Sequence, residues 1–286
     1  MNASARSVKW LLTLLVASSA AAHGESHAAR NVDGIMDNSF LVEEAYNQEA
    51  GVVQHIFTAF YAVDRVPGPD DSAWNLSFTQ EWPVGGQTHQ FSYTVPYGFV
   101  RSGGEKVEGI GDVLLNYRYQ VCYEETHLRA LAPRFSLVLP TGDERRGLGE
   151  DTLGYQWNVP FSTAMRDSWF LHLNAGLTYL PEAASAQARD LLHYNLGAST
   201  IFAATRNVHF LLEWIGVWQQ GPDSTGRLRR EFAALVSPGV RTAWNVGDSA
   251  QLVLGLGVPI GLTRSAPDVG VFLYLSFEHE FRKDRR

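Results

Sequence analysis

The sequence predicts an all-β fold, a transmembrane antiparallel up-and-down β-barrel of about 12 strands that follows a cleaved signal peptide. Three observations predict it: an export signal at the N-terminus, a hydrophobic period of two in many segments, and connections that alternate between short and long. The composition agrees, because 12% aromatic residues, 26 Gly and 12 Pro favour strands and turns over a helical bundle.

Charge and cysteine content exclude several classes of protein and site. The formal net charge is −7, which argues against a nucleic-acid partner because nothing offsets phosphate repulsion. The single cysteine, Cys122, closes no internal disulfide and supplies no thiolate zinc site. His23 and His27 stand four residues apart, but in a new N-terminus we expect them to be solvated. We therefore expect neither a cofactor nor a metal.

The N-terminus has the three parts of a secretory signal peptide. Arg6 and Lys9 precede the apolar run 10–17, and the small residues 18–22 follow it. We expect cleavage near Ala22, because the apolar run is shorter than the roughly 20 residues that a membrane anchor needs. The expected organisation is a signal peptide (1–22), a periplasmic N-terminal segment or plug (23–50), an outer-membrane barrel (51–281) and a basic tail (282–286).

The period of the hydrophobic pattern is that of strands. Between Trp74 and Trp82, apolar residues occupy nearly every second position and polar residues the positions between. The clearest such segments are 74–82, 91–99, 113–121, 153–161, 252–260 and 271–281. Weaker alternation covers 51–63, 129–139, 169–180, 191–202, 208–219 and 232–244. These segments make twelve candidate strands, each about as long as a barrel strand that spans a bilayer.

The connections between these segments alternate in length, as in barrels of the outer membrane. The expected long loops are 64–71, 101–110, 140–151, 181–190, 220–231 and 261–268. An even number of strands places both termini on the short-turn side, the periplasm. This topology predicts two aromatic girdles, with Trp74 and Trp218 at the outer rim and Trp82, Trp169, Trp244 and Phe281 at the periplasmic rim.

A soluble β-sandwich or lipocalin-like barrel is the competing interpretation, since its strands also alternate. Its water-facing side would be rich in Lys and Glu, whereas here that side is mostly Gly, Ser, Thr, Asn and Gln. The only lysines after the signal, Lys106 and Lys283, lie outside the predicted strands. Small polar residues suit a barrel lumen better. Prolines inside strands of a closed sheet require bulges or rim positions, and we expect these at Pro96, Pro133, Pro160, Pro238 and Pro259.

Four stretches carry a family resemblance: FLVEEAYNQEAGVVQHI (40–56), GIGDVLLNYRYQ (109–120), LPTGDERRGLG (139–149) and the terminal FLYLSFEHEF (272–281). They resemble the outer-membrane family named for the meta-cleavage pathway of phenol degradation, whose members are described as transporters. The resemblance implies a membrane barrel and uptake of aromatic or other hydrophobic compounds. Phe281 resembles the C-terminal aromatic that the barrel-assembly machinery recognises, although here the residues 282–286 follow it.

Ionisable residues on the polar face of the strands are the candidate lumen or constriction residues, because charges within a membrane wall must be paired or hydrated. They form either a network that braces the barrel or a filter for solutes. In the segment before the first strand, a plug or gate is the candidate role of Glu43, Glu44 and Tyr46, and a periplasmic tether is the alternative. The lumen set is Glu81, Arg118, Arg134, His172, His193, Glu213 and Arg241, with His209, Glu278 and Glu280 on the same face.

The predicted function is passive passage of small hydrophobic or aromatic solutes through a narrow or gated lumen, since twelve strands enclose less space than the 16 to 18 of a wide porin. The expected partners are outer-membrane lipids and lipopolysaccharide, a small hydrophobic solute, and the barrel-assembly machinery. A purely structural barrel and a lipid-modifying enzyme are the alternatives. His55 and His279 lie on the apolar face, but no Ser accompanies them convincingly and no GxSxG occurs, so no enzyme is predicted.

Overall fold

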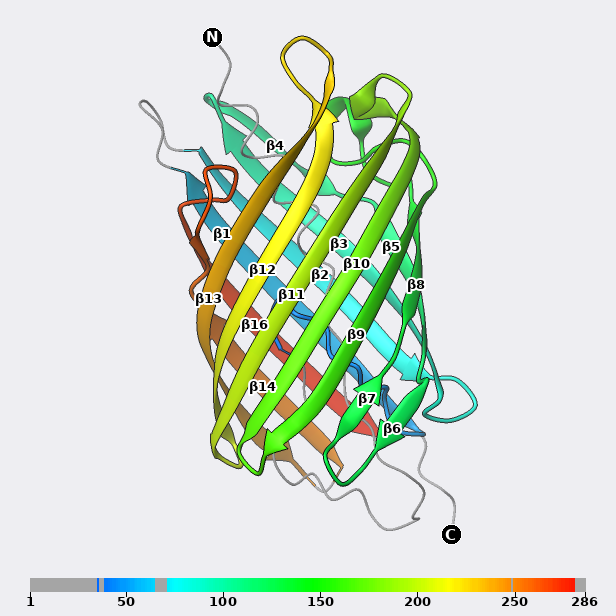
Figure 1. Cartoon of the computed structure of the whole chain (residues 1–286), viewed down its shortest axis with the longest axis vertical. Helices are drawn as coiled ribbons and strands as arrows, with labels where there is room; N and C mark the ends of the chain where they lie inside the picture. The colour runs from blue at the N-terminus through cyan, green and yellow to red at the C-terminus, as the bar shows by residue number, and fades with distance from the viewer. Residues whose placement is uncertain (1–34, 36–38, 65–70, 248, 281–286) are drawn as a thin grey trace.

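The computed structural model describes residues 35, 39–64, 71–247 and 249–280, and it is a closed antiparallel barrel of 12 strands (Figure 1). Strand neighbours follow chain order around the barrel, and the pairing of β9 with β10 and of β1 with β16 closes it. The predicted fold class is therefore confirmed. The predicted signal peptide (1–22), Phe281 and the basic tail 282–286 lie outside the described residues.

The strands are β1 (Val52–Asp64), β2 (Asp71–Pro83), β3 (His89–Ser102), β4 (Glu105–Ile110), β5 (Val113–Tyr119), β6 (Cys122–Glu124), β7 (Arg129–Leu131), β8 (Arg134–Leu139), β9 (Gly154–Arg166), β10 (Trp169–Ala183), β11 (Arg189–Thr205), β12 (Val208–Pro222), β13 (Leu228–Val246), β14 (Ala250–Gly257), β15 (Ile260–Gly261) and β16 (Val269–Glu280). Two short 3-10 turns, η2 (Glu144–Arg146) and η3 (Ala184–Ala186), lie in the connections. No helix in the described part of the chain is long and apolar enough to cross a membrane.

Three barrel strands are interrupted, and the prolines explain where. β4, β5 and β6 follow one another as one strand, as do β7 with β8 and β14 with β15. Pro133 and Pro259 sit in two of these breaks. Pro160 and Pro238 stand in the neighbouring strands opposite the same breaks, where their carbonyls accept the N–H groups of Ala132 at 3.3 Å and Val258 at 2.9 Å. A proline lacks an N–H, and here each one meets an irregular stretch that needs none.

Pro96 follows the same rule. Its carbonyl accepts the N–H of Gly111 at 3.0 Å, and Gly111 lies in the break between β4 and β5. The expected bulges or rim positions are replaced by another arrangement: Pro133 and Pro259 lie in strand breaks, and the other three prolines lie in continuous strands opposite a break. Each break interrupts the ladder without opening an edge, because β3, β9 and β13 run uninterrupted beside it.

The strands extend further on the long-loop side than the sequence pattern predicts. The expected loop 101–110 is in fact a hairpin, because β3 continues to Ser102, and β4 starts at Glu105 after Gly103 and Gly104 in left-handed conformations. Lys106 consequently lies within β4, and its predicted place outside the strands is wrong. Three of the six residues of β4 are charged, and none is buried, so the alternation of buried and exposed residues that marks a half-buried strand is absent there.

Apolar side chains point outward and polar ones inward. Phe57, Trp157 and Leu212 are about half exposed on the outer surface. Their strand neighbours turn the other way and are buried in the lumen, as Asn158 and Glu213 do. This is the orientation of a membrane barrel and the opposite of a soluble one, whose apolar side chains face inward.

The five tryptophans of the predicted girdles lie toward the strand ends. Trp74 and Trp218 are in the halves of β2 and β12 beside the long loops, and Trp82, Trp169 and Trp244 are close to the short turns. Aromatic neighbours accompany them: Trp74 packs on Tyr61, Trp169 on Phe202 and Trp218 on Phe232, with ring centroids 4.8, 5.0 and 4.5 Å apart.

The loop between β12 and β13 is closed by one carboxylate. Asp223 accepts hydrogen bonds from the Thr225 hydroxyl at 2.6 Å, from the Thr225 and Arg227 backbone N–H groups, and from Arg229 at 2.9 Å. These bonds, that of the Thr225 hydroxyl first, hold the pKa of Asp223 below its ordinary value. The closed loop is thus favoured above the ordinary pKa of a carboxyl and loses this support as the pH falls through the lowered pKa.

An arginine on the outer face tests the orientation of the barrel. Leu275 pairs with Phe57 in β1, midway between the two rims. We expect Leu275→Arg to lower the free energy of unfolding in bilayers by about 2–4 kcal/mol, because it places a charge in hydrocarbon. The matched variant Glu105→Arg, in the exposed hairpin, should change it by less than about 0.5 kcal/mol. Urea titration in lipid vesicles measures both, and equal effects would contradict the orientation.

Candidate functional site

Residues 39–50 run inside the barrel, and we call them the inner segment. Figure 1 shows this blue stretch of chain behind strands β9 to β11. Residues 39–48 are all buried, although their backbone forms neither helix nor strand. A buried backbone without regular structure needs other hydrogen-bond partners, and the side chains of the barrel wall provide them.

Glu213 holds the first part of the inner segment. The carboxylate, fully buried on β12, accepts the backbone N–H groups of Phe40, Leu41 and Val42 with the same oxygen, at 3.1, 2.9 and 3.1 Å. Three consecutive N–H groups that converge on one oxygen form an anion-binding concavity. The bend of the chain at these residues is therefore fixed by a charge on the wall.

Glu43 is held by the opposite wall. Its carboxylate pairs with Arg118 of β5 and with Arg134 of β8, whose Nε lies 2.8 Å from Oε1, and it also accepts a hydrogen bond from the Asn158 amide of β9. Carboxylate and guanidinium groups are all at most 5% exposed. A buried charge cluster of this kind is stable only while every partner is present.

The next residues bind to β9 and β10. The Glu44 carboxylate lies 3.5 Å from Nε2 of His172, and the ring's Nδ1 lies 2.8 Å from the hydroxyl of Ser162. The same hydroxyl accepts the backbone N–H of Ala45 at 2.9 Å. Ser162, His172 and Glu44 thus form a continuous buried row that joins the wall to the inner segment.

Amide side chains complete the docking of the inner segment. Gln120 donates to the Ala45 carbonyl at 2.7 Å and accepts the Asn47 N–H at 3.0 Å. Gln90 accepts the Gln48 N–H at 2.7 Å. The Tyr46 hydroxyl donates to the Leu128 carbonyl near a short turn. Three of these four contacts pair a wall side chain with the backbone of the inner segment, so the wall recognises the shape of the segment's backbone as well as the Tyr46 side chain.

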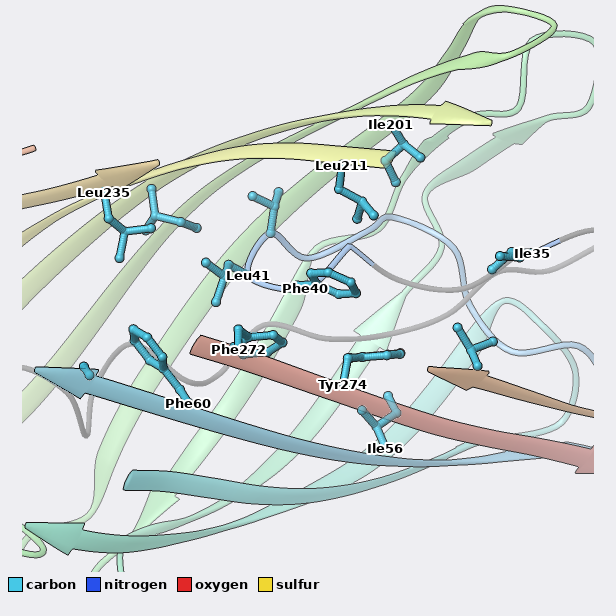
Figure 2. Packing of buried hydrophobic residues seen from close by; sticks show 14 of the residues in the cluster. Ile35, Phe40, Leu41, Ile56, Phe60, Ile201, Leu211, Leu235, Phe272 and Tyr274 are labelled. Carbon is cyan, nitrogen blue, oxygen red and sulfur yellow. The ribbon is translucent and has the colours of Figure 1, made fainter. Parts of the chain in front are cut away.

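The other face of the inner segment packs on an apolar part of the wall. The Phe40 ring lies 5.6 Å from Phe272 and 5.5 Å from Tyr274, centroid to centroid. Figure 2 shows Phe40 and Leu41 between side chains of β11–β13 on one side and of β1 and β16 on the other. A β-carbon at Gly255 would overlap the Phe40 ring, and one at Gly239 would come within 2.7 Å of it. Glycines on β13 and β14 therefore make the space that this ring fills.

The lumen thus has two unlike sides, which the sequence pattern did not reveal. From β2 through β10 most inward residues are polar, as expected, although Leu114, Val138 and Leu180 form a smaller apolar cluster there. On β11–β16 and β1, however, several inward side chains are apolar: Ile56, Phe60, Ile201, Leu211, Ile215, Leu235, Val253 and Phe272, all buried. The expectation of a lumen lined throughout by small polar residues is wrong on this side. The available signal was the weak alternation of 191–202, 208–219 and 232–244, where both faces are apolar.

The remaining candidate residues of the predicted set are also buried in the lumen. Glu81 is 1% exposed and accepts the Gln90 amide at 3.0 Å. His193 accepts the Gln220 N–H at 3.1 Å, and Arg241 lies 3.3 Å from Nδ1 of His209. Arg118, Arg134, His172 and Glu213 of the predicted lumen set bind the inner segment through the contacts described above. Pattern reading did not single out Asn158, Ser162, Gln90 or Gln120, since amides and hydroxyls on a lumen face look alike in sequence.

No group of three or more His, Cys, Asp or Glu side chains within the described ranges is placed to hold a metal ion. The contacts described above make this a docking site for the chain's own segment, built from charges, amides and an apolar surface. It can fix that segment, and it presents an apolar surface to whatever takes its place.

Glu43→Gln tests whether the charge cluster fixes the inner segment. The variant keeps the volume of the side chain but leaves Arg118 and Arg134 buried without their counter-charge, so we expect the docked state to lose about 3–5 kcal/mol. A cysteine at position 42 in a Cys122→Ser background, labelled with a membrane-impermeant maleimide, reports docking. Labelling should be much faster in Glu43→Gln. Glu124→Gln, at an exposed carboxylate near the short turns, is the control, and equal labelling rates in both variants would contradict the proposed anchor.

Several solved structures are similar to this chain. Among solved structures, the COG4313 outer membrane channel from Pseudomonas putida F1 shares the fold with a TM-score of 0.62 at 14% identity, over 81% of this chain and 96% of that one. The KdgM and NanC porins also match, with TM-scores of 0.44 and 0.49 at 9% and 6% identity, over 80% of this chain and 99% and 100% of theirs.

The comparison with curated proteins finds no match. The family model described as "Putative MetA-pathway of phenol degradation" matches residues 43–278. This match begins inside the inner segment, at Glu43, and ends two residues before the end of β16, so it includes the later part of the inner segment and nearly all of the barrel. The predicted resemblance is confirmed: the chain belongs to this phenol-degradation family.

Proposed function

We propose that this protein is an outer-membrane channel for small hydrophobic solutes, aromatic ones included, and that the inner segment closes it. The observation that carries the proposal is the two-sided lumen. Its apolar side, formed by residues such as Ile215, Leu235 and Phe272, is covered by Phe40 and Leu41. A solute that displaces these side chains meets an apolar surface of the same kind, so an apolar solute is favoured over a polar one.

The polar side supports a closing role for the inner segment. Its contacts to Glu213, Gln90 and Gln120 are hydrogen bonds to backbone, which water entering the lumen can replace one at a time. The Glu43 cluster is the exception, because two guanidinium groups lose their counter-charge together. In this proposal the cluster sets the closed position, and the candidate residues Glu43, Glu44 and Tyr46 act as the gate.

The shared fold is consistent with the proposal, since that fold occurs in an outer membrane channel. Lipids and lipopolysaccharide around the outward apolar face, and the barrel-assembly machinery during insertion, belong to the same proposal. Passive passage of a small apolar solute needs no cofactor.

A reversible lock tests the gate. The Ser39 and Ser199 hydroxyl oxygens lie 2.8 Å apart, so Ser39→Cys with Ser199→Cys, in a Cys122→Ser background, should form a disulfide that ties the inner segment to β11. We expect oxidation to reduce uptake of toluene into liposomes at least about tenfold and a reductant to restore it, because the locked segment covers the apolar wall.

The Ser39→Cys single variant controls for the oxidant, and deletion of residues 31–49 should raise both toluene flux and single-channel conductance. Flux that is equal in the oxidised and reduced double variant would contradict the gate. A protein without toluene flux in any form, the deletion included, would contradict the channel itself.

One observation keeps an enzyme as the second candidate. Ser162, His172 and Glu44 follow one another at hydrogen-bond and ion-pair distance, the residue types of a hydrolase triad. Their present contacts hold the inner segment, however, and the Ser162 hydroxyl accepts an N–H from it. We expect no hydrolysis of short-chain nitrophenyl esters by the purified protein or by the 31–49 deletion. Turnover that disappears in Ser162→Ala would establish the enzyme instead.

A further inference from the structure

Two histidines meet on the outer face of the barrel where its first and last strands join. His55 is in β1 and His279 in β16, 224 residues apart in sequence, yet their Nε2 atoms lie 3.4 Å apart. The register pairs His279 with Val53 and His55 with Phe277, so the two histidines are diagonal neighbours on one face. The channel proposed above makes no use of this pair.

The distance between the two nitrogens suits a shared metal ion. A hydrogen bond from a ring N–H is usually about 2.7–3.2 Å long, so 3.4 Å is long for one. Two imidazole nitrogens bound to one tetrahedral zinc ion at about 2.0–2.1 Å lie about 3.3–3.4 Å from each other. The pair thus has the spacing of a chelate with room for an ion.

The proton positions favour the same interpretation. Nδ1 of His279 lies 3.1 Å from the backbone carbonyl of Glu280, an acceptor, so this nitrogen carries the proton and donates it. Nε2 of His279 then has a free lone pair directed at His55. A metal-binding histidine typically donates its other ring N–H to a carbonyl or carboxylate in this way, which fixes the ring for its ligand.

Aromatic packing holds both rings. His55 stacks between Phe78 and Phe277, with interplanar angles of 10° and 16°, and Phe277 also packs on His279, with centroids 5.3 Å apart. Side chains fixed in this way lose little rotational freedom when they bind an ion. Both rings are only half-buried, and His279 is next to the end of β16, so ions reach the pair from the aqueous side of the periplasmic rim.

We propose that His55 and His279 form a binding site for a divalent transition metal, zinc or copper being the chemistry that paired imidazoles select, with water in the other coordination positions. The ion links β1 to β16 across the closure of the barrel. No hairpin joins these two strands, so a link between them shortens the longest loop of the unfolded chain. The ion therefore stabilises the closed barrel.

Zinc binding by the full chain without an affinity tag tests the proposal. The parent protein carries His23→Asn and His27→Asn, because these two histidines stand four residues apart and could bind zinc themselves. We expect the parent to bind one zinc ion in isothermal titration calorimetry, and either His55→Asn or His279→Asn to weaken the affinity about tenfold or more. His89→Asn should leave it unchanged, since His89 bonds the Tyr117 hydroxyl and lies outside the pair.

A second measurement does not depend on the variants folding. Copper added to the parent at one equivalent should give an electron paramagnetic resonance spectrum with two coordinated nitrogens, and the barrel's melting temperature should be higher in zinc than in a chelator. A parent that binds no zinc, a double variant that keeps the parent's affinity, or a copper spectrum without two nitrogens would each overturn the site.

Discussion

The buried carboxylates that hold the inner segment are the constraint on which the rest of the structure depends. Glu213 needs three N–H groups around one oxygen, and the irregular backbone at 40–42 supplies them. Glu43 needs cations, and Arg118 and Arg134 supply them from β5 and β8. Without the inner segment these wall residues would be charges in a water-filled lumen, and without the wall the segment would have no folded shape. Barrel and segment are therefore one structure.

The two sides of the lumen follow from this dependence. The polar side holds the segment in place through directional bonds, which specify position. The apolar side holds Phe40 through shape, since the glycines on β13 and β14 leave a space that only a flat ring fills. Apart from the Glu43 ion pairs, the directional bonds lose little when water replaces them, whereas the apolar contact is favourable only with another apolar group. In the proposed channel, such a closure would respond to the polarity of what enters the lumen.

The sequence predicted the barrel well because its strongest signal, the period of two, is a property of one strand alone. The prolines were also informative: Pro133 and Pro259 marked breaks, and Pro160 and Pro238 marked the strands beside them. The apolar side of the lumen escaped prediction because an inward Leu211 next to an outward Leu212 erases the alternation that identifies a face. The partners of Glu43 escaped it too, since the arginines lie 75 and 91 residues away and only the closed sheet brings them together.

The proposed metal-binding histidines, His55 and His279, form a second contact between distant parts of the chain. The inner segment joins the N-terminal region to β5, β8, β9 and β12 from within. His55 and His279 join the first strand to the last from outside, near the rim at which the inner segment passes into β1. The two act on different equilibria: the inner contacts hold the segment in the lumen, and the proposed metal link would add to the β1–β16 pairing that closes the barrel. Because Gln54, beside His55, also reaches Ser276 of β16 through a hydrogen bond in the lumen, the seam is held from both faces at the same level. The proposed gating movement of the inner segment therefore requires no opening of the seam between β1 and β16.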